Sequence, residues 1–74
     1  MELSERIKEL REAAGMTQMS LAIGANTQPS YISLIENGKV RPGVDILNSI
    51  ARVLGTTMDT LINGVEDTAN AASE

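Results

Sequence analysis

The sequence contains no cysteine and no histidine, and its only aromatic residue is Tyr31. Without cysteine, the chain forms neither a disulfide framework nor a thiolate zinc site, and it has no cysteine nucleophile. Without histidine, it lacks the commonest general base and the commonest metal ligand. The carboxylates that remain are scattered and form no catalytic motif. We therefore expect a protein that is not an enzyme.

Long hydrophobic runs are also missing. No apolar stretch approaches the roughly 20 residues that a membrane span requires, and the first five residues lack the basic start of a signal peptide. These absences predict a soluble, cytoplasmic protein. The 74 residues make one small domain, which buries only about 60% of the surface of its unfolded chain.

Basic residues are few, with six Lys and Arg against ten Asp and Glu, for a net charge of −4. This balance is unusual for a nucleic-acid-binding protein. The charge is unevenly distributed, because residues 17–44 carry Glu36 against Lys39 and Arg41, a net +1. Residues 45–74 carry five acids against Arg52, a net −4. The middle of the chain can therefore approach an anionic partner such as DNA. Because few basic residues are available for phosphates, its non-specific affinity for DNA should be modest.

Apolar residues recur at helical spacing in five segments that are bounded by capping residues. We expect a helix capped by Ser4 that runs to about Ala14, and others at Gln18 to Gly24 or Ala25, Pro29–Glu36, Val44–Leu54, and Met58 to about Ile62. The expected apolar faces are Leu3, Ile7, Leu10 and Ala14 in the first helix, and Val44, Leu47, Ile50, Ala51 and Leu54 in the fourth. The pattern predicts one all-α domain over residues 1–64. Residues 65–74 are small and acidic, and we expect a flexible tail or the start of a linker.

Residues 17–38 predict two short helices around a tight turn. Thr17 is a suitable N-cap for the first of them, and Pro29 suits the first position of the second. Gly24 and Asn26 are both candidates for the positive-φ residue of the turn. We expect Asn26, because a turn at Gly24 would leave the preceding helix very short. Two helices in this arrangement are typical of DNA-binding helix-turn-helix motifs, in which the second helix enters the major groove.

The second of these helices should present a largely neutral outer face. Ile32 and Ile35 are spaced to face the core, which turns a set of mostly polar residues outward: Ser30, Ser33, Leu34 and Asn37. Leu34 can contact a thymine methyl group. A single exposed leucine is also ordinary on any protein surface.

Several residues are suited to contact the phosphate backbone. Gln18 begins a helix, where free N–H groups and the helix dipole favour a phosphate. Lys39 and Arg41 follow the second helix on a loop, from which they can reach the backbone or the adjacent minor groove. The hydroxyl of Tyr31 can bond a phosphate, or the ring can serve packing alone. Two further candidates in the first helix are Arg6 and Arg11, whose charges can equally be solvated.

Several short motifs occur together in the chain at characteristic spacing: Arg6-Ile7-Lys8-Glu9-Leu10-Arg11, Thr17-Gln18, Leu21-Ala22, Pro29-Ser30-Tyr31-Ile32-Ser33, Ile35-Glu36-Asn37-Gly38-Lys39 and Leu54-Gly55. With them, residues 4–63 resemble the phage Cro and lambda-repressor-like DNA-binding domains, also called the xenobiotic-response-element helix-turn-helix family. The resemblance implies a compact five-helix fold with the helix-turn-helix at helices 2 and 3. It also implies a dimer that binds a palindromic operator and regulates transcription without a cofactor.

The resemblance also implies residue roles. It makes Gln18 the phosphate-contacting and helix-positioning residue, and Asn37 and Lys39 backbone contacts. It assigns the base-reading surface to Gln28, Pro29, Ser30, Ser33 and Leu34. The chain departs from the usual pattern at Pro29, which cannot hydrogen-bond a base, and at Leu34, where a polar or basic residue is commoner. The turn is a third departure, because Gly24 and Asn26 exchange places relative to the family's usual turn pattern.

Two functions stay open. One is a sequence-specific regulator of transcription, a repressor of phage or plasmid type, with double-stranded operator DNA as its partner. The other is a protein-interaction module of antitoxin or anti-repressor type, which the low positive charge favours. We also expect a homodimer, because the C-terminal helices carry more apolar residues than a small monomer can cover: Ile46, Met58, Leu61, Ile62 and Val65. Ile46 and Val53 fall off the apolar face of their helix and should meet another subunit or the last helix.

Overall fold

The computed structural model describes residues 2–64 of the chain. Within this range it contains five helices and no strand: α1 (Leu3–Ala13), α2 (Gln18–Gly24), α3 (Pro29–Glu36), α4 (Val44–Leu54) and α5 (Met58–Asn63). The predicted all-α, five-helix fold is confirmed. The predicted tail at 65–74, and Val65 of the predicted dimer surface, lie outside the described residues.

Local capping sets most helix boundaries. The hydroxyl oxygens of Thr17 and Thr57 accept the backbone N–H groups of Ser20 and Thr60, at 3.0 and 3.1 Å. Each bond satisfies a donor that would otherwise lack a partner at a helix start. Gly55 ends α4 in the left-handed conformation, with a φ of 73°. The bounds of α3 and α4 match the prediction.

The predicted start of the first helix was wrong. The N-cap of α1 is Glu2, and Ser4 lies within the first turn. Glu2 and Glu5 form a capping box, in which the backbone N–H of Glu2 donates to Oε1 of Glu5 at 3.4 Å. Two glutamates can exchange bonds in this way, so no serine is needed at the cap.

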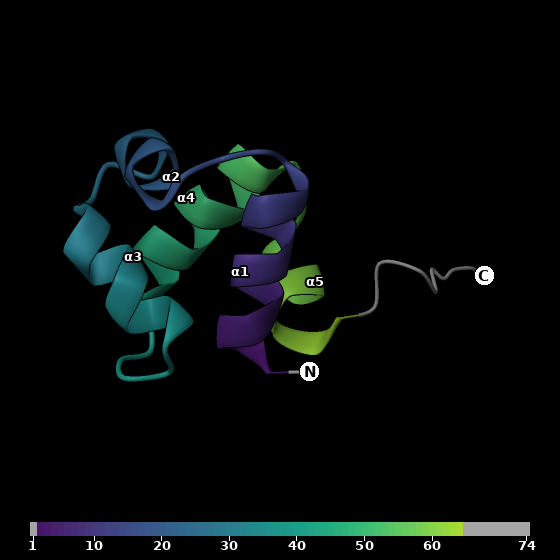
Figure 1. The fold of residues 1–74 in the computed structure, drawn as a ribbon. Coiled ribbons are helices and arrows are strands. Elements are labelled where there is room, and N and C mark those ends of the chain that lie inside the picture. Colours follow the sequence, from purple (N-terminus) through teal and green to yellow (C-terminus); the bar gives the residue numbers. More distant parts are fainter. Residues whose placement is uncertain (1, 65–74) are drawn as a thin grey trace.

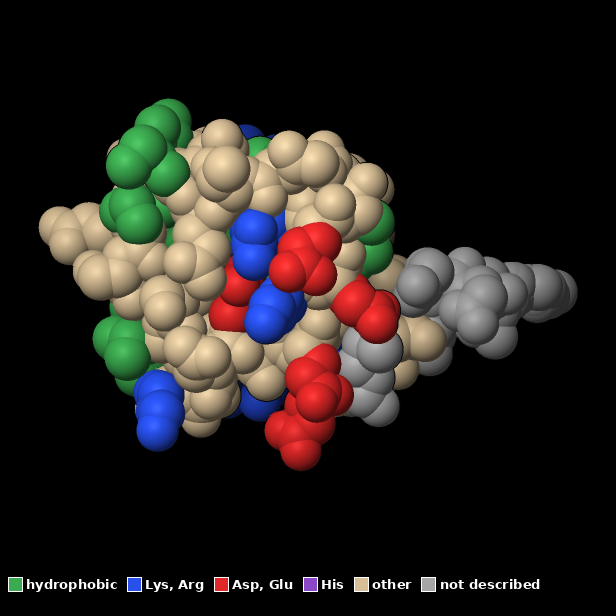
Figure 2. Space-filling model, in the orientation of Figure 1, with side chains coloured by type: hydrophobic (Ala, Val, Ile, Leu, Met, Phe, Trp, Pro, Cys, Tyr) green, Lys and Arg blue, Asp and Glu red, His purple; other side chains and the backbone are tan. Residues whose placement is uncertain are grey.

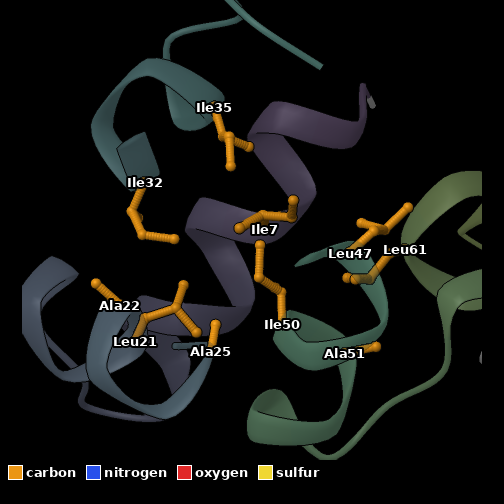
Figure 3. Close-up of a cluster of buried hydrophobic side chains, with 10 residues drawn as sticks. All are labelled: Ile7, Leu21, Ala22, Ala25, Ile32, Ile35, Leu47, Ile50, Ala51 and Leu61. Carbon is orange, nitrogen blue, oxygen red and sulfur yellow. The ribbon is translucent and has the colours of Figure 1, made fainter. Parts of the chain in front are cut away.

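The helices surround one apolar core. In Figure 1, α1 stands in the middle, with α2 and α3 on one side and α5 on the other. Figure 3 shows that Ile7 of α1 and Ile50 of α4 point toward each other near the centre of the buried cluster. The core consists of Ile7, Leu21, Ala22, Ala25, Ile32, Ile35, Leu47, Ile50, Ala51 and Leu61.

Several apolar residues do not lie where the predicted helix faces placed them. Val44 is 69% exposed, because it is the first residue of α4 and lies beyond the end of the core, which begins at Leu47. Ala14 is exposed because it is the C-cap of α1 rather than part of its apolar stripe. Val53 has a neighbour that the sequence did not predict, the helix α2. A Cβ atom on Gly24 would lie 2.9 Å from Cγ2 of Val53, so Val53 packs on α2.

Candidate nucleic-acid interface

The turn between α2 and α3 depends on Asn26. Its φ is 60°, and among residues 2–64 it is the only residue other than glycine with a positive φ. Asparagine tolerates this left-handed conformation because its short side chain is polar. Gly24 instead remains within α2, where its small size admits Val53. The prediction that Asn26 rather than Gly24 makes the turn is confirmed.

The outer face of α3 carries polar neutral side chains around one leucine. Ile32 and Ile35 are buried as predicted, and they fix the orientation of the helix. The residues turned away from the core are Ser30, Ser33, Leu34 and Asn37, of which Ser33 is half-buried and the others are exposed. Leu34 is 43% exposed. Gln28 and Pro29 are exposed at the start of the helix, so the predicted base-reading residues share one end and one face of α3.

A buried ion pair joins the inner side of α3 to α1. Oε2 of Glu36 accepts Nε–H of Arg11 at 2.7 Å, and Oε1 accepts Nη2–H at 3.1 Å. Arg11 also donates from Nη1 to the carbonyl of Met16 at 2.8 Å. The hydrogen bonds that Arg11 donates to Glu36 raise the pKa of Arg11 above its ordinary value, although burial opposes this shift. The guanidinium therefore keeps its charge at every working pH.

Arg11 is thus not a phosphate contact, and that prediction was wrong. Only 8% of the residue is exposed, because its planar fork of donors is used up inside the protein by a carboxylate and a carbonyl. The other candidate in α1, Arg6, points toward α5, whereas Arg11 points toward α3. The Nη1 atom of Arg6 donates to the carbonyl oxygens of Leu61 and Ile62 at the end of α5.

The same carboxylate holds Gln18. Nε2 of Gln18 donates to Oε1 of Glu36 at 3.1 Å, which fixes the carboxamide at the start of α2. Glu36 therefore joins α1, α2 and α3 through two side chains. Our sequence reasoning assigned no role to Glu36. The available signal was spacing, since Glu36 lies four residues after the buried Ile32 and so shares its face of the helix.

The predicted backbone contacts lie at the ends of α3. Lys39 and Arg41 are exposed on the loop that follows the helix, while Tyr31 is half-buried with its ring packed on the core. Figure 2 shows that the flank formed by α2 and α3 is mostly green and tan, with blue at its lower end. Acidic side chains gather over α1 instead, and the exposed residues of that helix include Glu5, Glu9 and Glu12.

Two other kinds of site find no support in residues 2–64. No group of acidic side chains in this range is arranged to hold a metal ion. None of its helices is long and apolar enough to cross a membrane. Every buried side-chain nitrogen and oxygen in the described part of the chain has a hydrogen-bond partner.

Comparison with known proteins identifies the family. Residues 7–61 match the helix-turn-helix family model. The chain belongs to this family. The HTH-type transcriptional regulator DdrOP3 of Deinococcus deserti is 36% identical over 66 residues, which cover 89% of this chain and 51% of that protein. The chain thus spans about half the length of this relative.

Solved structures agree on the fold. The regulator SinR in complex with DNA superposes with a TM-score of 0.76 at 32% identity, covering 80% of this chain and 95% of that one. The P22 c2 repressor in complex with a synthetic operator has a TM-score of 0.84 and covers 88% of this chain and 98% of that one. Its identity is 23%, so this likeness concerns the fold alone. The resemblance to lambda-repressor-like domains is confirmed.

Proposed function

We propose that this chain is the DNA-binding part of a sequence-specific transcriptional regulator, a repressor of phage or plasmid type. It would read a palindromic operator with α3 in the major groove. The observation that carries this proposal is the geometry of α2 and α3, in which Asn26 makes the turn and the neutral face of α3 points outward. The similarity to DdrOP3, a transcriptional regulator, supports it, as do the DNA-bound structures of SinR and the P22 c2 repressor.

The proposal gives each exposed residue of this flank a role. Gln18, fixed by Glu36, would meet a phosphate at the start of α2. The base edges would be read by Gln28, Pro29, Ser30, Ser33 and Leu34. The backbone contacts would be Tyr31, Asn37, Lys39 and Arg41. Phosphate contacts position such a domain and base contacts give it specificity.

Further properties follow from this proposal. The protein would act as a homodimer in the cytoplasm, because a palindromic operator reflects two-fold symmetry in the protein. It would need no cofactor and would not be an enzyme. Residues 65–74 would form a flexible tail or the start of a linker, outside the DNA-binding domain.

A second candidate is a protein-interaction module of antitoxin or anti-repressor type. Two observations favour it. The net charge of −4 weakens attraction to DNA, and α2 exposes the apolar side chains of Met19 and Ile23, by 60% and 72%. Exposed apolar groups on neighbouring turns are suited to contact another protein.

Selection of bound duplexes from a random DNA library at low salt separates the two functions. A regulator should enrich an inverted repeat whose half-sites lie about 34–36 Å apart, roughly one turn of DNA. The absence of any enriched sequence would overturn the regulator and leave the interaction module.

A further inference from the structure

The face of α3 that would meet base edges carries no formal charge. The only charged residue of this helix, Glu36, is turned inward, where Arg11 and Gln18 donate to it. The exposed outer positions are Ser30, Leu34 and Asn37. Discrimination between bases must therefore come from neutral hydrogen bonds and from apolar contact.

This composition excludes the commonest way to read guanine. An Arg or Lys that bonds the O6 and N7 atoms of guanine is the most frequent specific contact in the major groove. Arg11 is buried, and Arg6 is bonded to the end of α5. Lys39 and Arg41 lie on the loop beyond α3 rather than on its outer face, and the proposed function gives them phosphate contacts.

Leu34 occupies the centre of the neutral face. It lies one turn after Ser30 and three residues before Asn37, and 43% of it is exposed. An apolar side chain in the major groove has one matching group on a base edge, the C5-methyl group of thymine. The amide of Gln28, at the start of the same helix, matches the N6 and N7 atoms of adenine.

We propose that each half-site presents A·T base pairs to α3, with a thymine methyl group packed against Leu34 and an adenine edge facing the amide of Gln28. This inference rests on the proposed DNA-binding function, and it names the class of sequence that the site takes. It makes Leu34 a specificity-determining residue that acts without charge and without a hydrogen bond.

The test removes single methyl groups from the DNA. In the selected duplex, each thymine is replaced in turn by deoxyuridine, which keeps the base pair and loses only the C5-methyl group. Binding is measured by fluorescence anisotropy at one fixed salt concentration, because affinity depends strongly on salt. At one position in each half-site, the replacement should weaken binding about fourfold, the value of one buried methyl group.

A Leu34→Ala variant decides whether this effect belongs to Leu34. The variant should bind the thymine and deoxyuridine duplexes equally at that position, whereas other positions should behave as before. Val44→Ala is the control, because Val44 is an exposed apolar residue on α4 (69% exposed against 43% for Leu34) and has no place in the proposed DNA contact or dimer surface. The control should keep the full ratio between the two duplexes. Thermal melting of each variant checks that it is folded.

The two proposals fail in different ways. A selected repeat whose bases opposite α3 are G·C pairs would overturn the A·T half-site while the regulator stands. Equal binding of every deoxyuridine duplex by the natural protein would do the same. If no duplex is bound even at low salt, the DNA-binding function itself is overturned.

Discussion

The guanidinium of Arg11 and the carboxylate of Glu36 face each other inside the protein, with Nε 2.7 Å from Oε2 and Nη2 3.1 Å from Oε1. The two residues are 25 positions apart and come from α1 and α3. The pair replaces apolar packing at a place where three helices meet. Its contribution therefore depends on both partners being present.

Removing one partner should be severe and removing both should be mild. Arg11→Ala is expected to lower the free energy of unfolding by about 3 kcal/mol, because it leaves the Glu36 carboxylate buried without its counter-ion. The double variant Arg11→Met with Glu36→Leu should lose less than Arg11→Ala alone. Urea unfolding followed by circular dichroism measures both. If the double variant loses as much stability as the sum of the losses from Arg11→Met alone and Glu36→Leu alone, the two residues do not interact.

The turn can be tested at Asn26. Asn26→Ala should cost about 1 kcal/mol, because alanine keeps the Cβ that crowds the following carbonyl oxygen at a φ of 60° but lacks the short polar side chain with which asparagine tolerates this conformation. Asn26→Gly should leave the stability nearly unchanged, since glycine adopts this conformation without a steric penalty. Thermal melting compares the three proteins. Equal melting temperatures for the alanine and glycine variants would contradict the account of the turn.

Lys39 should contribute charge and no base preference. A flexible ammonium on a loop has no fixed orientation toward a base edge. Lys39→Ala should therefore weaken all DNA sequences about equally, and it should lower the slope of log affinity against log salt by about 1 for each protomer. Arg52→Ala, which removes one exposed charge from the last turn of α4, is the control. A change in preferred sequence on mutation of Lys39 would oppose this role.

The dimer surface that we propose is narrower than the sequence indicated. Leu61 is fully buried in its own protomer and cannot contribute, while Ile62 is 42% exposed. Ile62→Asp should convert a dimer to a monomer in sedimentation with little loss of stability. Ile23→Asp adds the same charge on α2, away from α5 in Figure 1, and should leave the dimer intact. If the natural protein sediments as a monomer both alone and with operator DNA, the homodimer is excluded.

Residues 67–74 should be dispensable for folding. Their composition offers no apolar stripe, and small acidic segments cannot offset the entropy lost on ordering. Deleting them should leave the melting temperature nearly unchanged. A loss of more than about 1 kcal/mol would be large for such a segment and would show that it packs on the domain.

Local chemistry explains what the sequence could predict. Pro29 and Thr17 define helix starts through their own backbone and hydroxyl groups, and Asn26 supplies the turn, so these features follow from short stretches of sequence. The outward position of Leu34 followed from the buried spacing of Ile32 and Ile35. These features can therefore be predicted without knowing how the helices pack together.

Contacts between distant segments explain what was missed. A glutamate at the end of a helix is normally solvated, and only the approach of α1 makes Glu36 a buried partner for Arg11. Val44 fits the apolar period of α4, yet it lies outside the core because no neighbouring helix reaches it. Leu61 and Ile62 are adjacent in the sequence and differ in burial only through the packing of α5 on the domain.

The bonds from Arg6 to the carbonyl groups of Leu61 and Ile62 join the first helix to the last. A ribosome delivers α1 first, and during synthesis the partners of Arg6 are still inside the exit tunnel. The core around Ile7 includes Leu61, so it too stays incomplete until residues 58–64 have emerged. Folding of this domain should therefore finish only after its last helix has left the ribosome. A chain stalled before that point would expose apolar surface to proteases and chaperones.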